Sequence, residues 1–243
     1  MGKSFLLVGG SSDIGLRLAT MLLDEGHGVT LLARDGERVD HLVAKGAVLV
    51  QGDALDEETV QTAVATASEA GENGLSGMAH LVGSIALRPP HATKLEDFQS
   101  VLQTNLVSAF LALKTAGKAM LKLGQGRMVF TSSVAGSYGL TNHEAIAAAK
   151  GGIEAMVRSA ASTYAGRGLR VNAVAPGLTE TRLGATVLRS DAIREASVGM
   201  IPLKRINEPE EIAQSMHWLL TAAPDNLTGQ VIHLDGGMSA LRG

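Results

Sequence analysis

The chain is short of several residue types, and each shortage limits what the protein can be. Its 243 residues contain no cysteine, which excludes disulfides and thiolate metal sites, and no metal centre is expected. The formal net charge is −3, from 21 Lys and Arg against 24 Asp and Glu, and the cations are not clustered. Phosphate backbones are bound by clusters of Lys and Arg, so nucleic acid is not an expected partner.

Long apolar runs are also missing. No run approaches the roughly 18 residues that a membrane span needs, so no membrane association is expected. The first residues lead directly into an apolar strand pattern, without the apolar region and cleavage site of a signal peptide. These features predict a cytoplasmic protein. Aromatic residues make up only 3% of the chain, so the core is expected to consist of Ala, Leu, Val and Ile.

Short apolar runs alternate with longer segments of helical period along the whole chain. Most of the runs are continuous, which is typical of parallel strands buried on both faces. Candidate strands are 4–8, 28–33, 47–51, 78–83, 127–131, 170–175 and 230–234, and candidate helices are 14–25, 36–45, 57–70, 95–123, 144–165 and 208–221. This order predicts an α/β Rossmann fold, a doubly wound, seven-stranded parallel sheet with helices on both faces. No linker divides the chain, so 1–243 is expected to form a single domain.

A glycine-rich turn lies between the first candidate strand and the first candidate helix. Its expected dinucleotide contacts are Gly9, Ser11, Ser12, Asp13, Ile14 and Gly15. Glycine lets the backbone turn sharply and approach a diphosphate closely, while free amides at the helix N-terminus face the negative charge. The carboxyl end of the first strand is also where open α/β sheets bind dinucleotides. The alternative is a plain strand-to-helix turn.

The second and third candidate strands end in residues that bear on the choice of dinucleotide. NAD-binding folds tend to place an acidic residue at the end of the second strand, for the ribose hydroxyls. Here Ala33 is followed by Arg34, whose guanidinium suits a 2′-phosphate, so NADP(H) is favoured over NAD(H). Asp53, next to Ala54, could accept a hydrogen bond from the adenine amino group. The alternatives are a solvated surface charge for Arg34 and a helix cap for Asp53.

Further motifs, in order along the chain, resemble those of the short-chain dehydrogenase/reductase (SDR) superfamily. The family turn Thr-Gly-x-x-x-Gly-x-Gly is matched from Val8 to Gly15, and Thr104-Asn105-Leu106 resembles the segment of the family's active-site Asn. Residues 131–136 and 150–152 resemble the segments of its catalytic Ser and Lys, at the family's spacing. Residues 170–177 and 235–237 resemble the strand beneath the nicotinamide and the C-terminal signature. The resemblance covers essentially the whole chain.

The resemblance implies roles for individual residues. Ser133 would bond the substrate carbonyl oxygen, Lys150 would bind the nicotinamide ribose, and Asn105 would hold a water in the proton relay. Further cofactor contacts would come from Gly83, Pro176, Gly177, Thr179 and Thr181. The implied activity is hydride transfer between a nicotinamide cofactor and a small-molecule carbonyl or alcohol, in a homodimer or homotetramer built through 95–123 and 144–165. The alternatives are local backbone bonding for Ser133 and an exposed helical position for Lys150.

The sequence departs from the family pattern in three places. One is the segment 81–84, which reads Leu-Val-Gly-Ser where the family has Asn-Asn-Ala-Gly. The family's catalytic acid is a Tyr four residues before the Lys, one helical turn earlier, and here that position is Ile146. A positioned general acid contributes about 10²–10⁴-fold to the rate, so its loss bears directly on catalysis. Asp13 stands at the second glycine of the turn, where a carboxylate would repel a pyrophosphate unless its side chain points away.

His143 is the candidate for the missing acid, because imidazole titrates near neutral pH and His143 lies three residues before Ile146. Tyr138 and water are the alternatives for proton delivery, and His143 with Glu144 could instead cap the helix. The sequence therefore predicts an SDR-type oxidoreductase with an atypical active site. The alternative is a non-catalytic dinucleotide-binding protein, such as a sensor or a silent partner in an oligomer. The irregular segment 176–207 is expected to form a mobile cover over the ligand. The apolar residues of its part 182–207 point to an apolar ligand, and the substrate itself cannot be read from the sequence.

Overall fold

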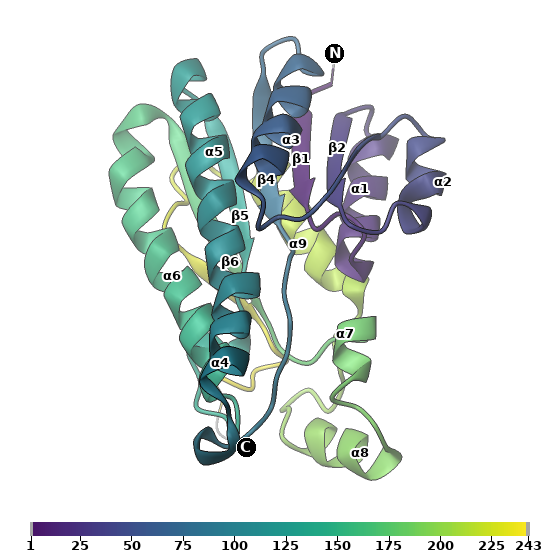
Figure 1. The fold of residues 1–243 in the computed structure, drawn as a ribbon, viewed down its shortest axis with the longest axis vertical. Helices are drawn as coiled ribbons and strands as arrows, with labels where there is room; N and C mark the ends of the chain where they lie inside the picture. Colours follow the sequence, from purple (N-terminus) through teal and green to yellow (C-terminus); the bar gives the residue numbers. More distant parts are fainter. Residues whose placement is uncertain (1, 242–243) are drawn as a thin grey trace.

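The computed structural model describes residues 2–241, which are organised around one seven-stranded sheet (Figure 1). The strand order is β3-β2-β1-β4-β5-β6-β7, and every neighbouring pair is parallel. The strands are β1 (Ser4–Val8), β2 (Gly28–Ala33), β3 (Val48–Gln51), β4 (Leu75–His80), β5 (Gly126–Thr131), β6 (Leu169–Pro176) and β7 (Val231–Leu234). This sheet confirms the predicted single-domain Rossmann-type architecture.

Helices cover both faces of the sheet, because parallel strands need crossover connections. One face carries α3 (Glu57–Glu69), α5 (Ser108–Leu123) and α6 (Glu144–Tyr164), and the other carries α1 (Asp13–Asp24) and α9 (Pro209–Thr221) (Figure 1). The other helical segments are η1 (Glu37–Val39), α2 (Asp40–Val43), η2 (Pro90–Ala92), α4 (Leu95–Leu102), η3 (Gln103–Val107), η4 (Val134–Gly136), η5 (Ala165–Arg167), α7 (Arg182–Ala185) and α8 (Asp191–Gly199). No helix among residues 2–241 combines the length and apolarity that a bilayer crossing requires.

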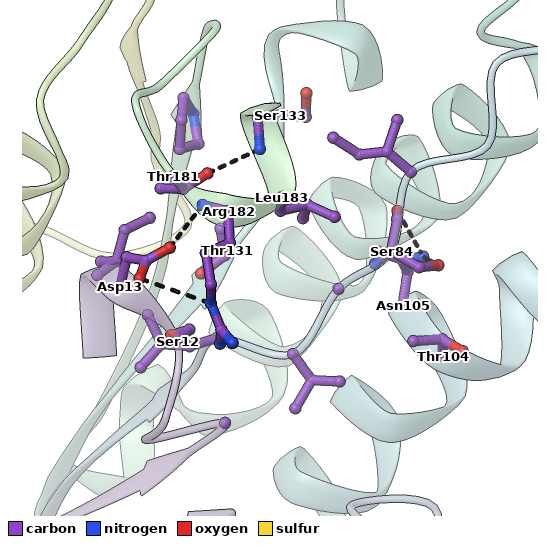
Figure 2. Close-up of a pocket in the computed structure, with 18 of the residues that line it drawn as sticks. Ser12, Asp13, Ser84, Thr104, Asn105, Thr131, Ser133, Thr181, Arg182 and Leu183 are labelled. Carbon is purple, nitrogen blue, oxygen red and sulfur yellow. Dashed lines mark hydrogen bonds and ion pairs between the residues drawn. The ribbon is translucent and has the colours of Figure 1, made fainter. Parts of the chain in front are cut away.

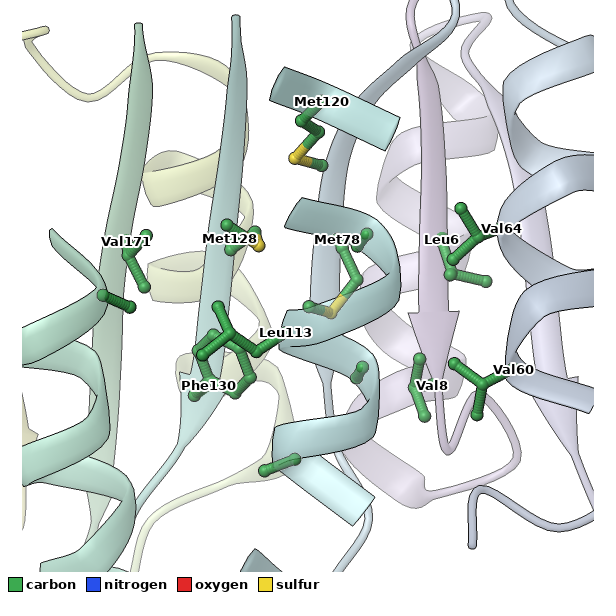
Figure 3. Close-up of a cluster of buried hydrophobic side chains, with 14 of the residues drawn as sticks. Leu6, Val8, Val60, Val64, Met78, Leu113, Met120, Met128, Phe130 and Val171 are labelled. Atoms are coloured by element: carbon green, nitrogen blue, oxygen red, sulfur yellow. The ribbon is translucent and has the colours of Figure 1, made fainter. Parts of the chain in front are cut away.

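Two layers of apolar side chains hold the helices to the sheet. Successive strand residues face opposite sides, so the continuous apolar strands supply both layers. Leu6, Met78 and Phe130 face α3, α5 and α6 (Figure 3), whereas Phe5 and Leu7 face α1 and α9. All five are fully buried. A fully buried side chain of this size contributes about 1.5–3 kcal/mol relative to exposure, so these layers fix the sheet on which the site is built.

The order of the strands across the sheet reverses at β1, which pairs with β2 on one side and with β4 on the other. At such a point the connections leave in opposite directions and open a crevice beyond the carboxyl ends of the strands. In Figure 1, α7 and α8 lie beyond this end of the sheet, apart from the two layers of long helices. The topology therefore places a crevice beside the segment that follows β6.

The structure corrects four predicted segments. The strand expected at 78–83 lies at Leu75–His80, because its partner β1 ends at Val8 and the ladder stops at the pair Val8–His80. The helix expected at 36–45 is two short pieces, because the backbone leaves helical geometry at Val39, whose φ is −107° and ψ is 0°. The helix expected at 95–123 is interrupted by the π turn Gln103–Val107. The segment 176–207 contains α7 and α8, whose caps Thr181 and Ser190 accept backbone hydrogen bonds.

Candidate active site

A cavity of about 510 Å³ lies at the carboxyl ends of the strands. It collects residues that follow six strands, from β1 to β6, together with residues of α6 and α7. Three of the four expected catalytic residues line it: Asn105, Ser133 and Lys150. Every expected cofactor contact except Gly15 also lines it, namely Gly9, Ser11, Ser12, Asp13, Ile14, Arg34, Asp53, Ala54, Gly83, Lys150, Pro176, Gly177, Thr179 and Thr181.

The turn after β1 presents three backbone amides without an acceptor. The N–H groups of Ser11, Asp13 and Ile14 make no hydrogen bond within residues 2–241, and all three residues line the cavity. Unpaired amides at a helix N-terminus suit an anion such as a diphosphate. The turn depends on Gly9, whose φ is +87° and where a Cβ would lie 2.9 Å from the backbone nitrogen of Val82. The turn therefore packs closely against the segment after β4 and presents its free amides to the cavity.

Gly15 is the one residue of the turn that the structure does not bring to the cavity. It is buried in the first turn of α1, and its N–H donates to Oγ of the N-cap residue Ser12 at 3.1 Å. A Cβ at this position would lie 2.8 Å from the carbonyl oxygen of Gly10 and 2.8 Å from Oγ of Ser12. Glycine is needed here because the helix start packs closely against the turn.

The carboxylate of Asp13 is bonded on both oxygens. Its Oδ1 accepts a hydrogen bond from Nη2 of Arg38 at 2.8 Å, and its Oδ2 accepts one from the backbone N–H of Arg182 at 2.7 Å. Figure 2 shows Asp13 facing Arg182 across the cavity wall. The guanidinium of Arg38 also donates to the carbonyl oxygen of Ser11 at 2.5 Å. The charge of Asp13 is thus compensated within the protein, and the side chain joins the turn to the segment after β6.

Arg34 and Asp53 form the outer end of the cavity. The side chain of Arg34 is 79% exposed, and its Nη1 lies 4.0 Å from Oδ2 of Asp53. Oδ1 of Asp53 accepts a hydrogen bond from the N–H of Leu55 at 2.9 Å. The alternative role of Asp53 as the cap of α3 is wrong, because the N-cap is Asp56. Among residues 2–241, this long contact is the one ion pair that Arg34 makes at the cavity edge.

The π turn between α4 and α5 aims Asn105 into the site. Asn105 is fully buried. Its Oδ1 accepts from the N–H of Ser84 at 3.2 Å, and its Nδ2 donates to Oγ of Ser84 at 3.0 Å and to the carbonyl oxygen of Val101 at 2.9 Å (Figure 2). Asn105 therefore holds the loop after β4 against the start of α5, next to the cavity. Single-turn π segments of this kind often occur at functional sites.

Two serines at the end of β5 have different partners. Oγ of Ser133 accepts a hydrogen bond from the N–H of Ala135 at 3.2 Å, which leaves its hydroxyl proton available to another acceptor. The hydroxyl of Ser132 donates to Oε1 of Glu154 at 2.8 Å. Glu154, on α6, also accepts from the hydroxyl of Ser137 at 2.8 Å and 2.9 Å. The buried carboxylate of Glu154 thus fixes both ends of the segment that carries Ser133.

Lys150 is buried on α6, so the alternative of an exposed helical lysine is wrong. Its Nζ donates to the carbonyl oxygen of Thr131 at 2.8 Å. Burial lowers the pKa of Lys150 from 10.5 to about 8, because the charged ammonium is removed from water.

His80, at the end of β4, is a neutral neighbour of Lys150. Burial, and to a smaller extent the charge of Lys150, lowers the pKa of His80 from 6.5 to about 3. The hydroxyl of Ser108 donates to the carbonyl oxygen of Thr104 at 2.6 Å, so it accepts from Nε2–H of His80 at 2.9 Å. This assigns the ring proton of the neutral imidazole to Nε2.

Ile146 occupies the cavity wall one turn before Lys150, and no tyrosine lines the cavity. His143 stands at the N-cap position of α6, where its Nδ1 lies 2.7 Å from the carbonyl oxygen of Thr141. Its side chain makes no capping hydrogen bond, and His143 is not among the lining residues. Tyr138 is 42% exposed and does not line the cavity either. The structure therefore does not bring either predicted substitute acid to the cavity lining.

Three residues around the site escape sequence reasoning: Arg38, Glu154 and Arg182. Arg38 and Arg182 lie 25 and 169 residues from Asp13, so no local periodicity connects them. Glu154 follows Lys150 by one helical turn, and that spacing was the one available signal that both face the same side.

The fold and the cavity together define a dinucleotide-binding protein of the Rossmann type. The chain belongs to the SDR superfamily, since residues 9–239 match the family described as "Enoyl-(Acyl carrier protein) reductase". It is 36% identical over 246 residues to "Carbonyl reductase family member 4" of Danio rerio, covering 99% of this chain and 100% of the relative.

Two further relatives come from Xanthobacter autotrophicus. The chain is 33% identical over 244 residues to "2-(S)-hydroxypropyl-CoM dehydrogenase 3", covering 97% of this chain and 96% of the relative. It is also 33% identical over 231 residues to "Inactive 2-(S)-hydroxypropyl-CoM dehydrogenase 2", covering 92% and 100%. Relatives at the same identity therefore include one named as an enzyme and one named as inactive.

Solved structures share the whole fold. Levodione reductase superposes with a TM-score of 0.91 at 29% identity, covering 99% of this chain and 98% of that one. The same values hold for a structure from Beutenbergia cavernae, described as an NAD(P)-dependent gluconate 5-dehydrogenase with NADP bound at low occupancy. Membership of the family is thereby established for this chain, and several of the matched relatives are named as oxidoreductases.

Proposed function

We propose that this protein is an NADP(H)-dependent oxidoreductase that interconverts a carbonyl compound and an alcohol by hydride transfer. The observation that carries the proposal is the convergence of Ser133, Asn105 and Lys150 with the free amides of the glycine-rich turn on one cavity. Bound NADP(H) would supply or accept the hydride at its nicotinamide. The free amides would bind its diphosphate, because they are aimed at the cavity from a helix N-terminus.

Arg34 supports NADP(H) over NAD(H). The strand β2 ends at Ala33, so the cavity has no carboxylate at the position where NAD-binding folds bond the ribose hydroxyls. The exposed guanidinium of Arg34 next to it can bind a 2′-phosphate with two parallel hydrogen bonds. The NADP reported for the Beutenbergia cavernae structure is consistent with this choice.

The catalytic roles follow from the N–H and O–H groups of the cavity that have no acceptor within residues 2–241. Ser133 would donate a hydrogen bond from its hydroxyl group to the substrate oxygen, since its Oγ already accepts from Ala135. Lys150 would donate to the nicotinamide ribose, and Asn105 would hold the loop after β4 and a relay water beside it. The predicted acid His143 would have to act from outside the cavity lining.

The substrate is proposed to be small and largely apolar. Ile85, Ile146 and Leu183 line the cavity along with the candidate catalytic groups. Assembly into a homodimer or homotetramer through α5 and α6 belongs to the same proposal, supported by the 52% exposed side chain of Phe110 on α5. The proposal also includes a cytoplasmic location and the action of residues 1–243 as one domain.

A non-catalytic dinucleotide-binding protein is the second candidate. Ile146 favours it, because the cavity wall offers an alkyl group at the position to which the resemblance assigns the family's acid. The relative whose name calls it inactive supports this candidate as well. The two candidates share cofactor binding and differ only in turnover.

Measurement of NADPH binding together with NADPH oxidation separates the two candidates. Binding is followed by the fluorescence of NADPH, and oxidation by its absorbance, with a panel of ketones and aldehydes of graded apolar size. We expect wild type to bind and to oxidise NADPH with at least one carbonyl, and Ser133→Ala to bind equally well but to turn over more slowly.

Ile146→Tyr provides the matched comparison. If wild type binds NADPH without oxidising it, while Ile146→Tyr gains turnover on the same panel, the oxidoreductase proposal fails and the binding protein stands. A wild type that does not bind NADPH at all contradicts both candidates.

A further inference from the structure

We propose that Nζ of Lys150 itself donates the proton to the substrate oxygen during carbonyl reduction. It would act in place of the tyrosine phenol that the resemblance assigns to the position of Ile146. This inference rests on the proposed oxidoreductase function and assigns the proton donor of that site. It gives Lys150 a role beyond binding of the cofactor ribose.

The other ionisable side chains of the cavity lie at its cofactor end. Five such residues line it: Asp13, Arg34, Asp53, Lys150 and Arg182. Arg34 and Asp53 face each other at the outer end, and Asp13 accepts from Arg182 at the glycine-rich turn. Only Lys150 shares the cavity wall with Ser133, Asn105 and Ile146, where the resemblance places the substrate oxygen.

The ammonium group of Lys150 has N–H donors that no acceptor in the described part of the chain uses. An ammonium carries three donors, and one of them is used by the carbonyl oxygen of Thr131 at 2.8 Å. Nζ forms no ion pair with a carboxylate of residues 2–241. The nearby carboxylate of Glu154 is bonded by Ser132 and Ser137 instead. Two N–H groups of Lys150 are therefore free for ligands.

The electrostatic surroundings suit proton transfer near neutral pH. Burial lowers the pKa of Lys150 to about 8, which makes its ammonium a stronger acid than that of an exposed lysine. The titratable group that faces it is His80 from β4, which is neutral because its pKa is about 3. The carboxylate of Glu154, one turn further along α6, accepts from Ser132 and Ser137 instead. A general acid works best when its pKa lies near the working pH.

The proton and electron balance of the reduction closes with Lys150 as the acid. Hydride adds to the carbonyl carbon and forms the new C–H bond, and the C=O π pair moves to oxygen. That oxygen forms an O–H bond as one N–H bond of the Lys150 ammonium breaks. The cofactor is oxidised, the carbonyl is reduced, and the neutral amine of Lys150 is protonated again from solvent.

The acidity of Lys150 can be measured without cofactor or substrate. Wild type is pulse-labelled with acetic anhydride over a pH series, and the labelling of each lysine is read by peptide mass spectrometry with exposed Lys122 as the internal reference. We expect the labelling of Lys150 to reach half its maximum near pH 8. A midpoint close to the value of about 10.4 for an unperturbed lysine contradicts the proposal.

Lys150→Arg tests the proton transfer itself. Arginine keeps a cation that can bind a ribose but does not release its proton. We expect kcat to fall by about 10²–10⁴-fold, the usual contribution of a general acid, with NADPH still bound in the fluorescence assay. The surface variant Lys122→Arg serves as the matched control for a lysine-to-arginine change.

Adding Ile146→Tyr to Lys150→Arg distinguishes a role of Lys150 as proton donor from a purely structural role. A phenol on the cavity wall is a new proton donor, so we expect it to restore part of the lost kcat, which would not happen if Lys150 only supported the fold. Wild-type kcat for reduction should also decline as pH rises past about 8.

Two results distinguish failure of this inference from failure of the proposed function. If wild type oxidises NADPH and Lys150→Arg keeps its kcat, while His143→Gln loses it, Lys150 is not the donor and the oxidoreductase proposal stands. If wild type oxidises NADPH with no carbonyl of the panel, the proposed function fails, and this inference fails with it.

Discussion

Replacing Asp13 with alanine is expected to destabilise the fold and to release the segment after β6 from the glycine-rich turn. Oδ1 of Asp13 accepts from Arg38 at 2.8 Å, and Oδ2 accepts from the N–H of Arg182 at 2.7 Å. Alanine removes both acceptors at once. It also leaves the guanidinium of Arg38, which is only 22% exposed, without its carboxylate.

The expected loss can be worked from these two bonds. A hydrogen bond to a charged group contributes about 1.5–3 kcal/mol when it is buried. The side chain of Asp13 is 23% exposed, so solvent screens part of this, and we expect a total loss of about 2–3 kcal/mol in the free energy of unfolding. For a chain of this length the loss corresponds to a fall of about 4–12 °C in Tm.

The control is Asp24→Ala on the same helix. Asp24 pairs with Lys45 at 3.6 Å, and their side chains are 64% and 52% exposed. Exposed pairs contribute about 0–1 kcal/mol, so this variant should melt close to wild type. Calorimetry measures Tm, and hydrogen exchange measures the protection of the backbone amide of Arg182. This amide should exchange faster in Asp13→Ala than in wild type, and at the wild-type rate in Asp24→Ala. Equal Tm values for the two variants, or unchanged exchange at Arg182, would refute the reasoning.

Three further outcomes are expected. Arg34→Ala should weaken NADPH binding by about 10–100-fold and NADH binding little, as measured by fluorescence titration, because one charge-assisted contact to the 2′-phosphate is lost; an equal loss for both contradicts the NADP(H) preference. Glu154→Leu should lower kcat and speed hydrogen exchange around Ser133, whereas Glu154→Gln, which can still bond both serine hydroxyls, should stay near wild type; a matching decline in both variants would argue against this.

The third of these outcomes concerns stability against pH. The unfolded chain binds a proton at Lys150 up to about pH 10.5, whereas the folded protein has lost it above about pH 8. Between these values the unfolded state binds more protons, so wild type should gain stability relative to Lys150→Met as pH rises, by up to about 3 kcal/mol. Urea unfolding of both proteins at pH 7.5 and 10 measures the difference in their free energies of unfolding. If that difference is the same at the two pH values, the lowered pKa of Lys150 in the folded protein is contradicted.

The sequence predicted the sheet well because its signals are local. Strands β1 and β2 were predicted at their exact residues, since a buried parallel strand is a continuous apolar run that ends in a turn. The shift of β4 to Leu75–His80 was not predictable, because the end of that strand is set by where its partner β1 stops. The π turn at Asn105 escaped for a similar reason, since the residues 95–123 keep a helical period through it.

The sequence by itself determined the Rossmann-type sheet, the position of the glycine-rich turn and many of the residues that meet in the cavity, because these are encoded by short motifs and periodic burial. It also placed the doubt about catalysis at Ile146. Only the tertiary structure decided how Asp13 is neutralised, that Lys150 is buried with a lowered pKa, and that His143 lies outside the cavity lining. These properties depend on contacts between residues far apart in the chain and on removal from water, neither of which local periodicity encodes.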